Sequence, residues 1–200
     1  MNTDNQALMR ASRESLAGKW GTAILTFFIY TLLTATSGAA RSHGSAFTIS
    51  STLTLIIGGP LALGAAIFSL SIARGKEARL EQLFLGFNNF ANALITYLLL
   101  LLYIILWTLL FIIPGIIAAL GYSLTFYILA DDPQIKPQDA LKKSKTMMNG
   151  YKMKLFYLWL RFLLLAILCI LTLGIGFLWL IPYVHVTMAK FYDDVSDLGL

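Results

Sequence analysis

Charged residues are scarce in this sequence. Asp, Glu, Lys and Arg make up only 12% of its 200 residues, whereas hydrophobic residues make up 58%. A soluble domain is about a quarter charged, so water cannot be the main solvent of this chain. The mean hydropathy of +0.76 supports the same conclusion. This composition points to a membrane protein.

The residues that hold metals, disulfides and cofactors are also few. Cys169 is the single cysteine and lies in an apolar run, which excludes a disulfide framework and a cysteine metal site. The two histidines, His43 and His185, are too few and too far apart for a metal cluster. No glycine-rich phosphate loop with its lysine occurs. We therefore expect no metal, no cofactor and no nucleic-acid partner.

Long apolar runs are what the sequence has in abundance. One membrane crossing takes about 20 residues, because the apolar core is ~30 Å thick and a helix rises 1.5 Å per residue. By this measure we expect spans near 20–36, 47–73, 91–112, 114–130, 155–173 and 175–192. They leave no room for a soluble catalytic domain. The predicted fold is therefore all-α, a single integral membrane domain over residues 1–200 with six transmembrane helices.

The runs are interrupted in the same way three times. Each predicted unit has a short amphipathic interfacial helix, an apolar run, a break and a second apolar run. The units cover about 7–74, 77–131 and 137–193. Because each has an even number of spans, the copies are expected to be parallel. The predicted breaks, where glycine or proline disfavours helix, are Gly58-Gly59-Pro60, Pro114-Gly115, and Gly174 to Gly176 with Pro182 following. The second span, 47–73, is long enough to tilt or kink at Gly58-Gly59-Pro60.

Two alternatives concern these runs. Each proline could instead kink one long helix, but the middle unit would then need a helix of roughly 60 Å. The first span could be a cleaved signal peptide, since basic residues precede it and Ser37-Gly38-Ala39-Ala40 offers small residues for cleavage. We favour retention, because residues 1–19 have the pattern of an amphipathic helix longer than a usual n-region.

Basic residues predict the orientation. Thirteen lysines and arginines lie at the termini and in the loops after the second and fourth spans, against Arg41 alone on the opposite side. Cytoplasmic loops carry this excess. We expect a multi-pass protein of the cell membrane with both termini in the cytoplasm.

Several motifs resemble those of a bacterial integral membrane family. They are Leu83-Phe84-Leu85-Gly86-Phe87, Leu106 to Gly115, Tyr122-Ser123, Ala130 to Pro133, Ala140 to Lys145 with Met148 and Gly150, Pro182-Tyr183, and Phe191-Tyr192. In this order they resemble the family called domain of unknown function 975. The resemblance implies a multi-pass membrane protein and supplies no catalytic residues. In helix pattern only, the chain is similar to the membrane domain attached to some glycerophosphodiester phosphodiesterases, although these 200 residues hold no phosphodiesterase domain.

Arg161 is the charged residue placed well inside a predicted span. Intramembrane charges are functional candidates. However, Arg161 lies seven residues after Lys154, about 10 Å by helical rise, so its side chain can also snorkel to the interface. If it pairs instead, the carboxylates on its side of the membrane are those of Asp131, Asp132, Asp193 and Asp194.

Ser123 and His185 form a weaker candidate. Both fall midway along predicted spans, as the nucleophile and base of an intramembrane serine hydrolase would. Rhomboid-type enzymes carry glycine directly after the nucleophile, and Leu124 stands here. A serine bonded to its own helix and a histidine at a helix contact are the favoured interpretation. We therefore expect no enzyme.

Two non-enzymatic classes are left. A scaffold or regulatory partner, through a protein partner or self-association, is favoured by small-residue surfaces that let helices approach closely. These surfaces are Gly59, Ala62, Gly64 and Ala66, and Gly115, Ala118, Ala119 and Gly121. A transporter of a lipid or other hydrophobic molecule is second, because repeats and broken helices occur in transporters but these spans lack a polar stripe.

The loop after the fourth span is the most charged part of the chain. Pro137 suits a helix start and Gly150 a helix end. We expect an interfacial helix with Leu141 and Met148 facing the acyl boundary. The basic residues expected to contact anionic phospholipid headgroups, or only to set the topology, are Lys142, Lys143, Lys145, Lys152 and Lys154.

Overall fold

The computed structural model describes residues 4–39 and 45–197, and within them the side chains outside residues 35–54. All regular structure in these ranges is helical. The elements are α1 (Asn5–Leu16), α2 (Trp20–Ala39), α3 (Ser45–Ala73), η1 (Leu80–Asn89, a 3₁₀ helix), α4 (Phe90–Leu110), α5 (Ile112–Tyr122), α6 (Thr125–Asp131), α7 (Pro137–Met147), α8 (Lys152–Leu171) and α9 (Phe177–Asp197). Arg41 and His43 lie outside the described residues.

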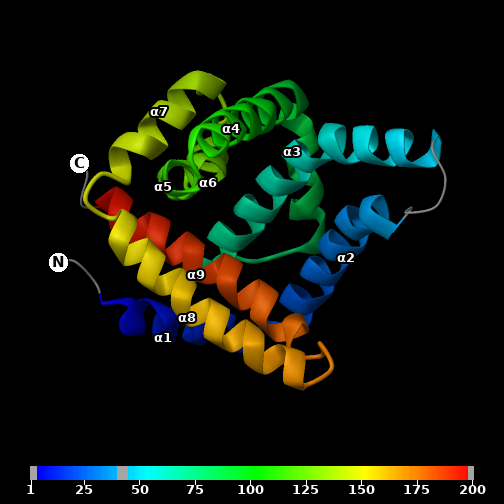
Figure 1. Ribbon diagram of the computed structural model, residues 1–200. Helices are drawn as coiled ribbons and strands as arrows, with labels where there is room; N and C mark the ends of the chain where they lie inside the picture. The colour runs from blue at the N-terminus through cyan, green and yellow to red at the C-terminus, as the bar shows by residue number, and fades with distance from the viewer. Residues whose placement is uncertain (1–3, 40–44, 198–200) are drawn as a thin grey trace.

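The order of the elements is periodic. A short helix is followed by two longer helical segments three times over: α1 with α2 and α3, η1 with α4 and α5–α6, and α7 with α8 and α9. The first helix of the chain begins, and the last helix ends, on the same side of the molecule (Figure 1).

Four segments of the described chain are long and apolar enough to cross a membrane. They are Leu55–Ala73, Leu80–Leu110, Ile112–Asp131 and Lys152–Leu171. A fifth is formed if α1 and α2, which meet at 100°, count as one broken span. The expectation of six spans is therefore not confirmed. α9 is not among the candidates, because only thirteen residues, Phe177 to Ala189, precede Lys190 and its acidic neighbours.

The expected break at Gly58-Gly59-Pro60 does not separate two helices. α3 continues through Pro60, and its ribbon changes direction partway along (Figure 1). Proline removes one backbone donor and crowds the preceding turn, so it bends a helix more readily than it ends one when the flanking turns are packed. Pro182 likewise lies inside α9.

The α4–α5 hairpin turns three residues before the expected Pro114-Gly115. Phe111 is the extended residue, with φ −160° and ψ 148°. Pro114 then falls in the first turn of α5, where its missing N–H costs little. Gly115 is buried where a side chain would overlap Thr108 of α4. An unexpected break follows at Ser123-Leu124, which separates α5 from α6.

The α8–α9 turn lies where glycines were expected to place it. α8 ends at Leu171 and α9 begins at Phe177. Leu173 and Gly174 both have positive φ, 53° and 86°. That conformation suits glycine but is uncommon for leucine. The turn therefore depends on Gly174 for its tightness.

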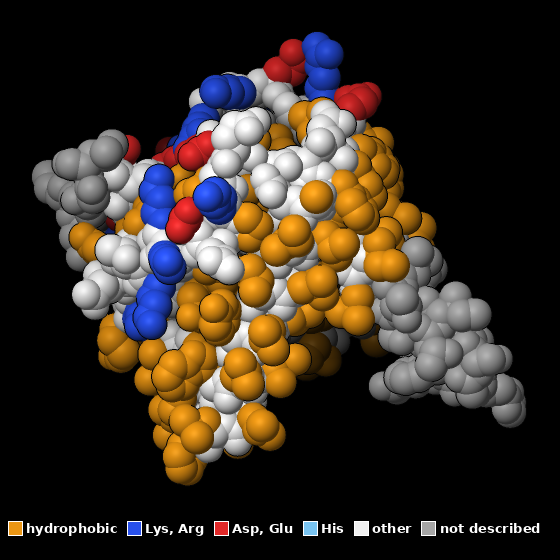
Figure 2. Space-filling view, turned by 90° about the horizontal axis from the view of Figure 1, so that it is seen from above, with side chains coloured by type: hydrophobic (Ala, Val, Ile, Leu, Met, Phe, Trp, Pro, Cys, Tyr) orange, Lys and Arg blue, Asp and Glu red, His pale blue; other side chains and the backbone are white. Residues whose placement is uncertain are grey.

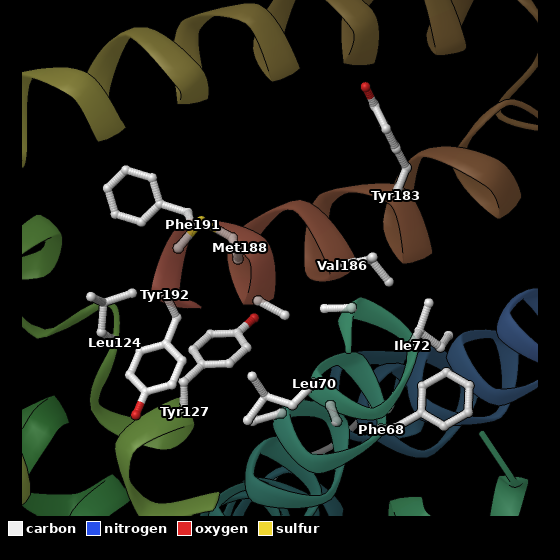
Figure 3. Packing of buried hydrophobic residues seen from close by; sticks show 14 of the residues in the cluster. Phe68, Leu70, Ile72, Leu124, Tyr127, Tyr183, Val186, Met188, Phe191 and Tyr192 are labelled. Carbon is white, nitrogen blue, oxygen red and sulfur yellow. The ribbon is translucent and has the colours of Figure 1, made fainter. Parts of the chain in front are cut away.

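The core lies where the second long segments of the three sets converge. Figure 3 shows side chains of α3, α6 and α9 pointing toward one another, with the rings of Tyr127 and Tyr192 side by side. These two rings stack with centroids 5.9 Å apart. Phe68 of α3 and Phe191 of α9 have no exposed surface. By contrast, α4 and α8 expose most of their apolar residues at the periphery.

Each short helix packs against the second segment of the preceding set. η1 lies on α3, and α7 lies on α6 and α5 and also on α4. The cycle is completed by α1, which packs on α9; there the Tyr183 hydroxyl donates to the Met9 carbonyl at 3.1 Å. At the α7 contact, the buried Ser144 hydroxyl donates to the Gly121 carbonyl at 2.8 Å. The first helix and the last helix of the described chain are thus in contact.

The α3–η1 contact is the closest of the three. A side chain at Gly64 would overlap the Leu83 carbonyl, and one at Gly86 would overlap the Pro60 carbonyl. Gly59 similarly faces Ala93 of α4. The small-residue surface on α3 therefore serves packing within the chain, since glycine lets two backbones meet.

Candidate functional site

Charged side chains gather toward one end of the molecule, and the rest of the visible surface is largely hydrophobic (Figure 2). This end holds the termini of α3, α6 and α9 and the short helix α7. Three features there are chemically distinct: a cluster around Arg74, a lysine surface on α7, and a groove lined by arginines.

The first feature is an ion cluster centred on Arg74, directly after α3. Its two terminal nitrogens donate to both carboxylate oxygens of Asp131, at 2.6 and 2.8 Å. Its Nε and one terminal nitrogen also donate to Asp193, at 3.1 and 2.8 Å. The Tyr192 hydroxyl donates to Asp131 at 3.0 Å. One guanidinium therefore ties together the ends of α3, α6 and α9.

The electrostatics of the cluster agree with its geometry. The hydrogen bonds from Arg74 to Asp131, with Asp193 contributing, raise the pKa of the guanidinium above its ordinary value. The side chains of Arg74, Asp131 and Asp193 are 32%, 34% and 24% exposed, so solvent screens them only in part. A fixed fork that meets two carboxylates suits arginine rather than lysine.

Lys154 has a different role from the one expected. Its ammonium lies 2.6 Å from Asp194, and the two side chains are only 13% and 10% exposed. It also lies 5.4 Å from the centre of the Phe191 ring. Lys154 thus joins α8 to α9 inside the protein. The hypothesis that Lys154 offers its charge to lipid headgroups is not supported by this burial.

The orientation of α7 also differs from expectation. Leu141 and Met148 are 2% and 0% exposed and pack inside the protein, not at the acyl boundary. α7 turns this face inward because Ser144 bonds to α5. Its outward face carries Lys142, Lys143 and Lys145, all exposed. Lys145 and Lys152 line a cavity of about 290 Å³ beside Trp107 and Pro114.

The third feature is a groove between α1, α8 and α9. Arg10 and Arg13 of α1 and Arg161 of α8 line a cavity of about 500 Å³ together with Tyr183. The Arg13 guanidinium lies 5.9 Å from the centre of the Tyr183 ring. Arg161 therefore faces α1, an arrangement that the sequence did not suggest.

The carboxylates considered as partners of Arg161 have other contacts. Asp131 and Asp193 bind Arg74, and Asp194 binds Lys154. Asp132 accepts a hydrogen bond from the Gln134 backbone at 3.2 Å. Within the described chain Arg161 forms no ion pair with any of the four.

Ser123 and His185 have separate surroundings. The Ser123 hydroxyl donates to the Leu120 carbonyl of the preceding turn at 2.8 Å. The His185 ring stacks on Phe27 of α2, with centroids 4.5 Å apart. Among the described interactions, none joins the two side chains. This is the arrangement of a backbone-bonded serine and a packed histidine.

Arg74, Arg10 and Arg13 are the residues whose importance was missed, because each was counted only toward topology. A signal for Arg74 was present in the sequence. Arg74 directly follows the second span of its predicted unit, and Asp131 and Asp193 lie at the ends of the second spans of the other two predicted units. For Arg10 and Arg13, the spacing of three residues places both on one face of α1. Nothing local indicated that this face lines a cavity together with Arg161.

These features define an all-helical protein with apolar helices of membrane-spanning length and a charged end. The family described as "Protein of unknown function (DUF975)" matches residues 1–121 and 109–198. The chain belongs to this family, as its motifs suggested. No curated protein matches the chain, and no solved structure does. The more distant resemblance to the membrane domain of phosphodiesterases is not shown.

Proposed function

We propose that this chain is a non-enzymatic membrane scaffold with six spans, built from three parallel helix-pair repeats that close into a ring. The observation that carries this proposal is the cyclic packing of the short helices. η1 lies on α3, α7 on α6, α4 and α5, and α1 on α9. In a chain of unrelated hairpins, the short helices would not be expected to pack each on the preceding helix pair.

Matched positions support the repeat. Gly64, Gly121 and Tyr183 stand ten residues before Arg74, Asp131 and Asp193, respectively. Each of the first three contacts a short helix: Gly64 meets Leu83, Gly121 meets Ser144 and Tyr183 meets Met9. Each of the second three belongs to the ion cluster. The cluster would therefore lie close to the axis of the ring.

The short helices are matched as well. α1 and α7 are each followed by a glycine with positive φ, Gly18 at 75° and Gly150 at 85°. Arg13 and Lys145 stand five residues before these glycines. Each lines a cavity: Arg13 the one between α1, α8 and α9, and Lys145 the one between α4, α5 and the start of α8. This correspondence favours one ancestral helix–hairpin unit.

The proposed topology gives a direct prediction. Reporter fusions after Leu200 and near Leu85 should report cytoplasm, and a fusion near His43 should report the exterior, because thirteen basic residues lie on one side. The measurement is a paired phosphatase and fluorescent-protein assay in a bacterial host. A fusion after Leu200 that reports the exterior would contradict the proposed topology of six spans with both termini in the cytoplasm.

The peripheral helices suit a scaffold. Leu102 of α4 and Leu163 of α8 are 50% and 56% exposed on apolar faces, available to lipid or to a second membrane protein. Lys142, Lys143 and Lys145 provide a basic surface beside them, suited to anionic headgroups. The core position of α3, α6 and α9 leaves these outer faces free to change without disturbing the fold.

Purification in native lipid with mass spectrometry tests the scaffold role. We expect a membrane protein, or a second copy of the chain, at a fixed ratio, and its loss when Leu102→Trp or Leu163→Trp alters an outer face. Gly21→Trp, on an exposed position of α2 with open space around it, is the matched control. A fixed ratio of a lipid or small molecule with no protein would favour the second candidate instead.

That second candidate is a transporter of a lipid or other hydrophobic molecule. It is supported by apolar cavities of about 290 and 310 Å³ on the sides of α8 and α9. Ligand sites of ~300 Å³ or more can hold a small apolar molecule. An intramembrane hydrolase using Ser123 and His185 is the least supported role, since the two side chains have separate partners.

A further inference from the structure

Two cavities adjoin between α1, α8 and α9. The larger, of about 500 Å³, has Arg10, Arg13, Arg161, Leu165 and Tyr183 among its lining residues. The smaller, of about 310 Å³, has Arg13, Trp20, Leu165, Cys169, Trp179 and Tyr183 among its lining residues. They share Arg13, Leu165 and Tyr183, so they form one groove. We call it the α1 groove.

One end of the α1 groove is strongly basic. Arg10, Arg13 and Arg161 all line the larger cavity, and no carboxylate does. Among the described ion pairs, none involves these three arginines, whereas Arg74, Arg79 and Lys154 all have carboxylate partners. Glu14, the one carboxylate of α1, is exposed and lines neither cavity.

Three guanidiniums gathered without an anion repel one another, and a charge within a membrane span is costly. Arg161 lies in the first half of α8, a membrane-length helix. An anion bound between the arginines would remove both costs. Guanidinium forks match phosphate oxygens with paired hydrogen bonds, so phosphate is the group that fits best.

The other end of the groove is apolar. Trp20, Leu168, Trp179 and Leu180 line the smaller cavity. Tyr183 forms part of both cavities and points away from the side chains of α3 (Figure 3). A ligand lying in the groove would therefore meet cations at one end and only weakly polar groups at the other. A free phosphate would leave the apolar end empty.

We propose that the α1 groove binds one anionic phospholipid, with its phosphate at Arg10, Arg13 and Arg161 and an acyl chain against Trp20 and Trp179. The net positive charge favours a headgroup such as phosphatidylglycerol. A zwitterionic headgroup would bring its own cation near three arginines. The lipid occupies the contact between α1 and α9, where the first and last parts of the chain meet.

Cys169 provides a reporter for this site. It lines the apolar end of the groove and is the single cysteine of the chain. The full chain, purified in detergent, is titrated with phosphatidylglycerol or with phosphatidylcholine of the same acyl chains. Labelling by N-ethylmaleimide is then followed by intact-protein mass spectrometry. We expect phosphatidylglycerol to slow labelling at least fivefold and phosphatidylcholine to change it less than twofold.

Matched variants locate the headgroup. Arg10→Gln with Arg161→Gln should raise the phosphatidylglycerol concentration for half-protection at least tenfold, since each charge near an anionic group is worth about a fivefold change. Lys142→Gln with Lys143→Gln removes the same charge from an exposed surface that lines neither cavity. That control should shift half-protection less than twofold. An unchanged labelling rate without lipid shows that each variant is folded.

Three results would overturn the proposal. One is equal protection by the two lipids, which would mean that only the acyl chain binds. Another is an equal shift in the arginine and lysine variants, which would reduce the effect to general surface charge. The third is full protection by inorganic phosphate alone, which would mean that an anion without an acyl chain is enough to shield Cys169.

Discussion

Gly64→Ala is expected to destabilise the protein strongly, although it adds only one methyl group. Its Cβ would overlap the backbone carbonyl of Leu83, which cannot move without shifting the whole of η1. Overpacking of this kind costs about 3 kcal/mol. We expect thermal unfolding in detergent, followed by size-exclusion chromatography with fluorescence detection, to show early loss of the monodisperse peak. Gly86→Ala should behave alike, because its Cβ would overlap the Pro60 carbonyl.

The matched control is Gly21→Ala in α2. No atom lies within 4 Å of the added Cβ, and alanine favours helix over glycine by about 1 kcal/mol. Stability should be unchanged or slightly higher. If Gly64→Ala unfolds at the wild-type temperature, η1 does not pack against α3 as described, and the ring loses one of its three contacts.

Methionine at Arg74 is expected to have the second largest effect. It removes the four hydrogen bonds to Asp131 and Asp193 and leaves both carboxylates facing the space of the lost cation. An exposed pair contributes 0–1 kcal/mol and a buried one 3–5 kcal/mol when broken. The three side chains are about a third exposed or less, so we expect a loss of about 2 kcal/mol in unfolding free energy.

Two companion variants separate the ion cluster from general charge effects. Arg79→Met breaks the pair with Glu77, in which both side chains are more than 60% exposed, and should leave the melting temperature unchanged. Arg74→Met combined with Asp131→Asn and Asp193→Asn removes the uncompensated charges and should recover at least half of the loss. A triple variant as unstable as Arg74→Met would show that packing of the arginine stem, rather than charge, holds the three helix ends together.

The α1 groove and the ion cluster occupy different parts of the proposed ring. Arg74 joins the ends of α3, α6 and α9. The groove lies at the outer contact between α1 and the last pair. A lipid in that contact would stabilise the closure of the ring, because it would replace repulsion among three arginines with attraction. The two variants above, at Arg74 and Arg161, should therefore act independently.

Local signals located most of the helices. Membrane-length apolar runs predicted α3, α4, the α5–α6 segment and α8, which are the four candidate spans of the described chain. Pro137 marked the start of α7, and Gly174 marked the turn before α9. Hydrophobic length and the backbone preferences of glycine and proline act within a few residues, so they can be recognised without a fold.

Local signals were less precise where packing competes with them. Pro114 predicted a break, but the extended residue is Phe111, because proline is tolerated in the first turn of the next helix. Leu141 and Met148 had the spacing of an interfacial face, yet they lie inside the protein. In an apolar solvent, the same leucine face suits either lipid or protein, so its spacing alone does not select between them.

What the sequence by itself determined is the helical class, the presence of apolar helices long enough to cross a membrane and the family of the protein. These follow from composition, run length and short motifs, which are properties of neighbouring residues. The tertiary structure alone decided that Arg74 meets Asp131 and Asp193, and that Arg10, Arg13 and Arg161 line one cavity. These residues lie 57 to more than 140 positions apart, and only the packing of helices against each other brings their charges together.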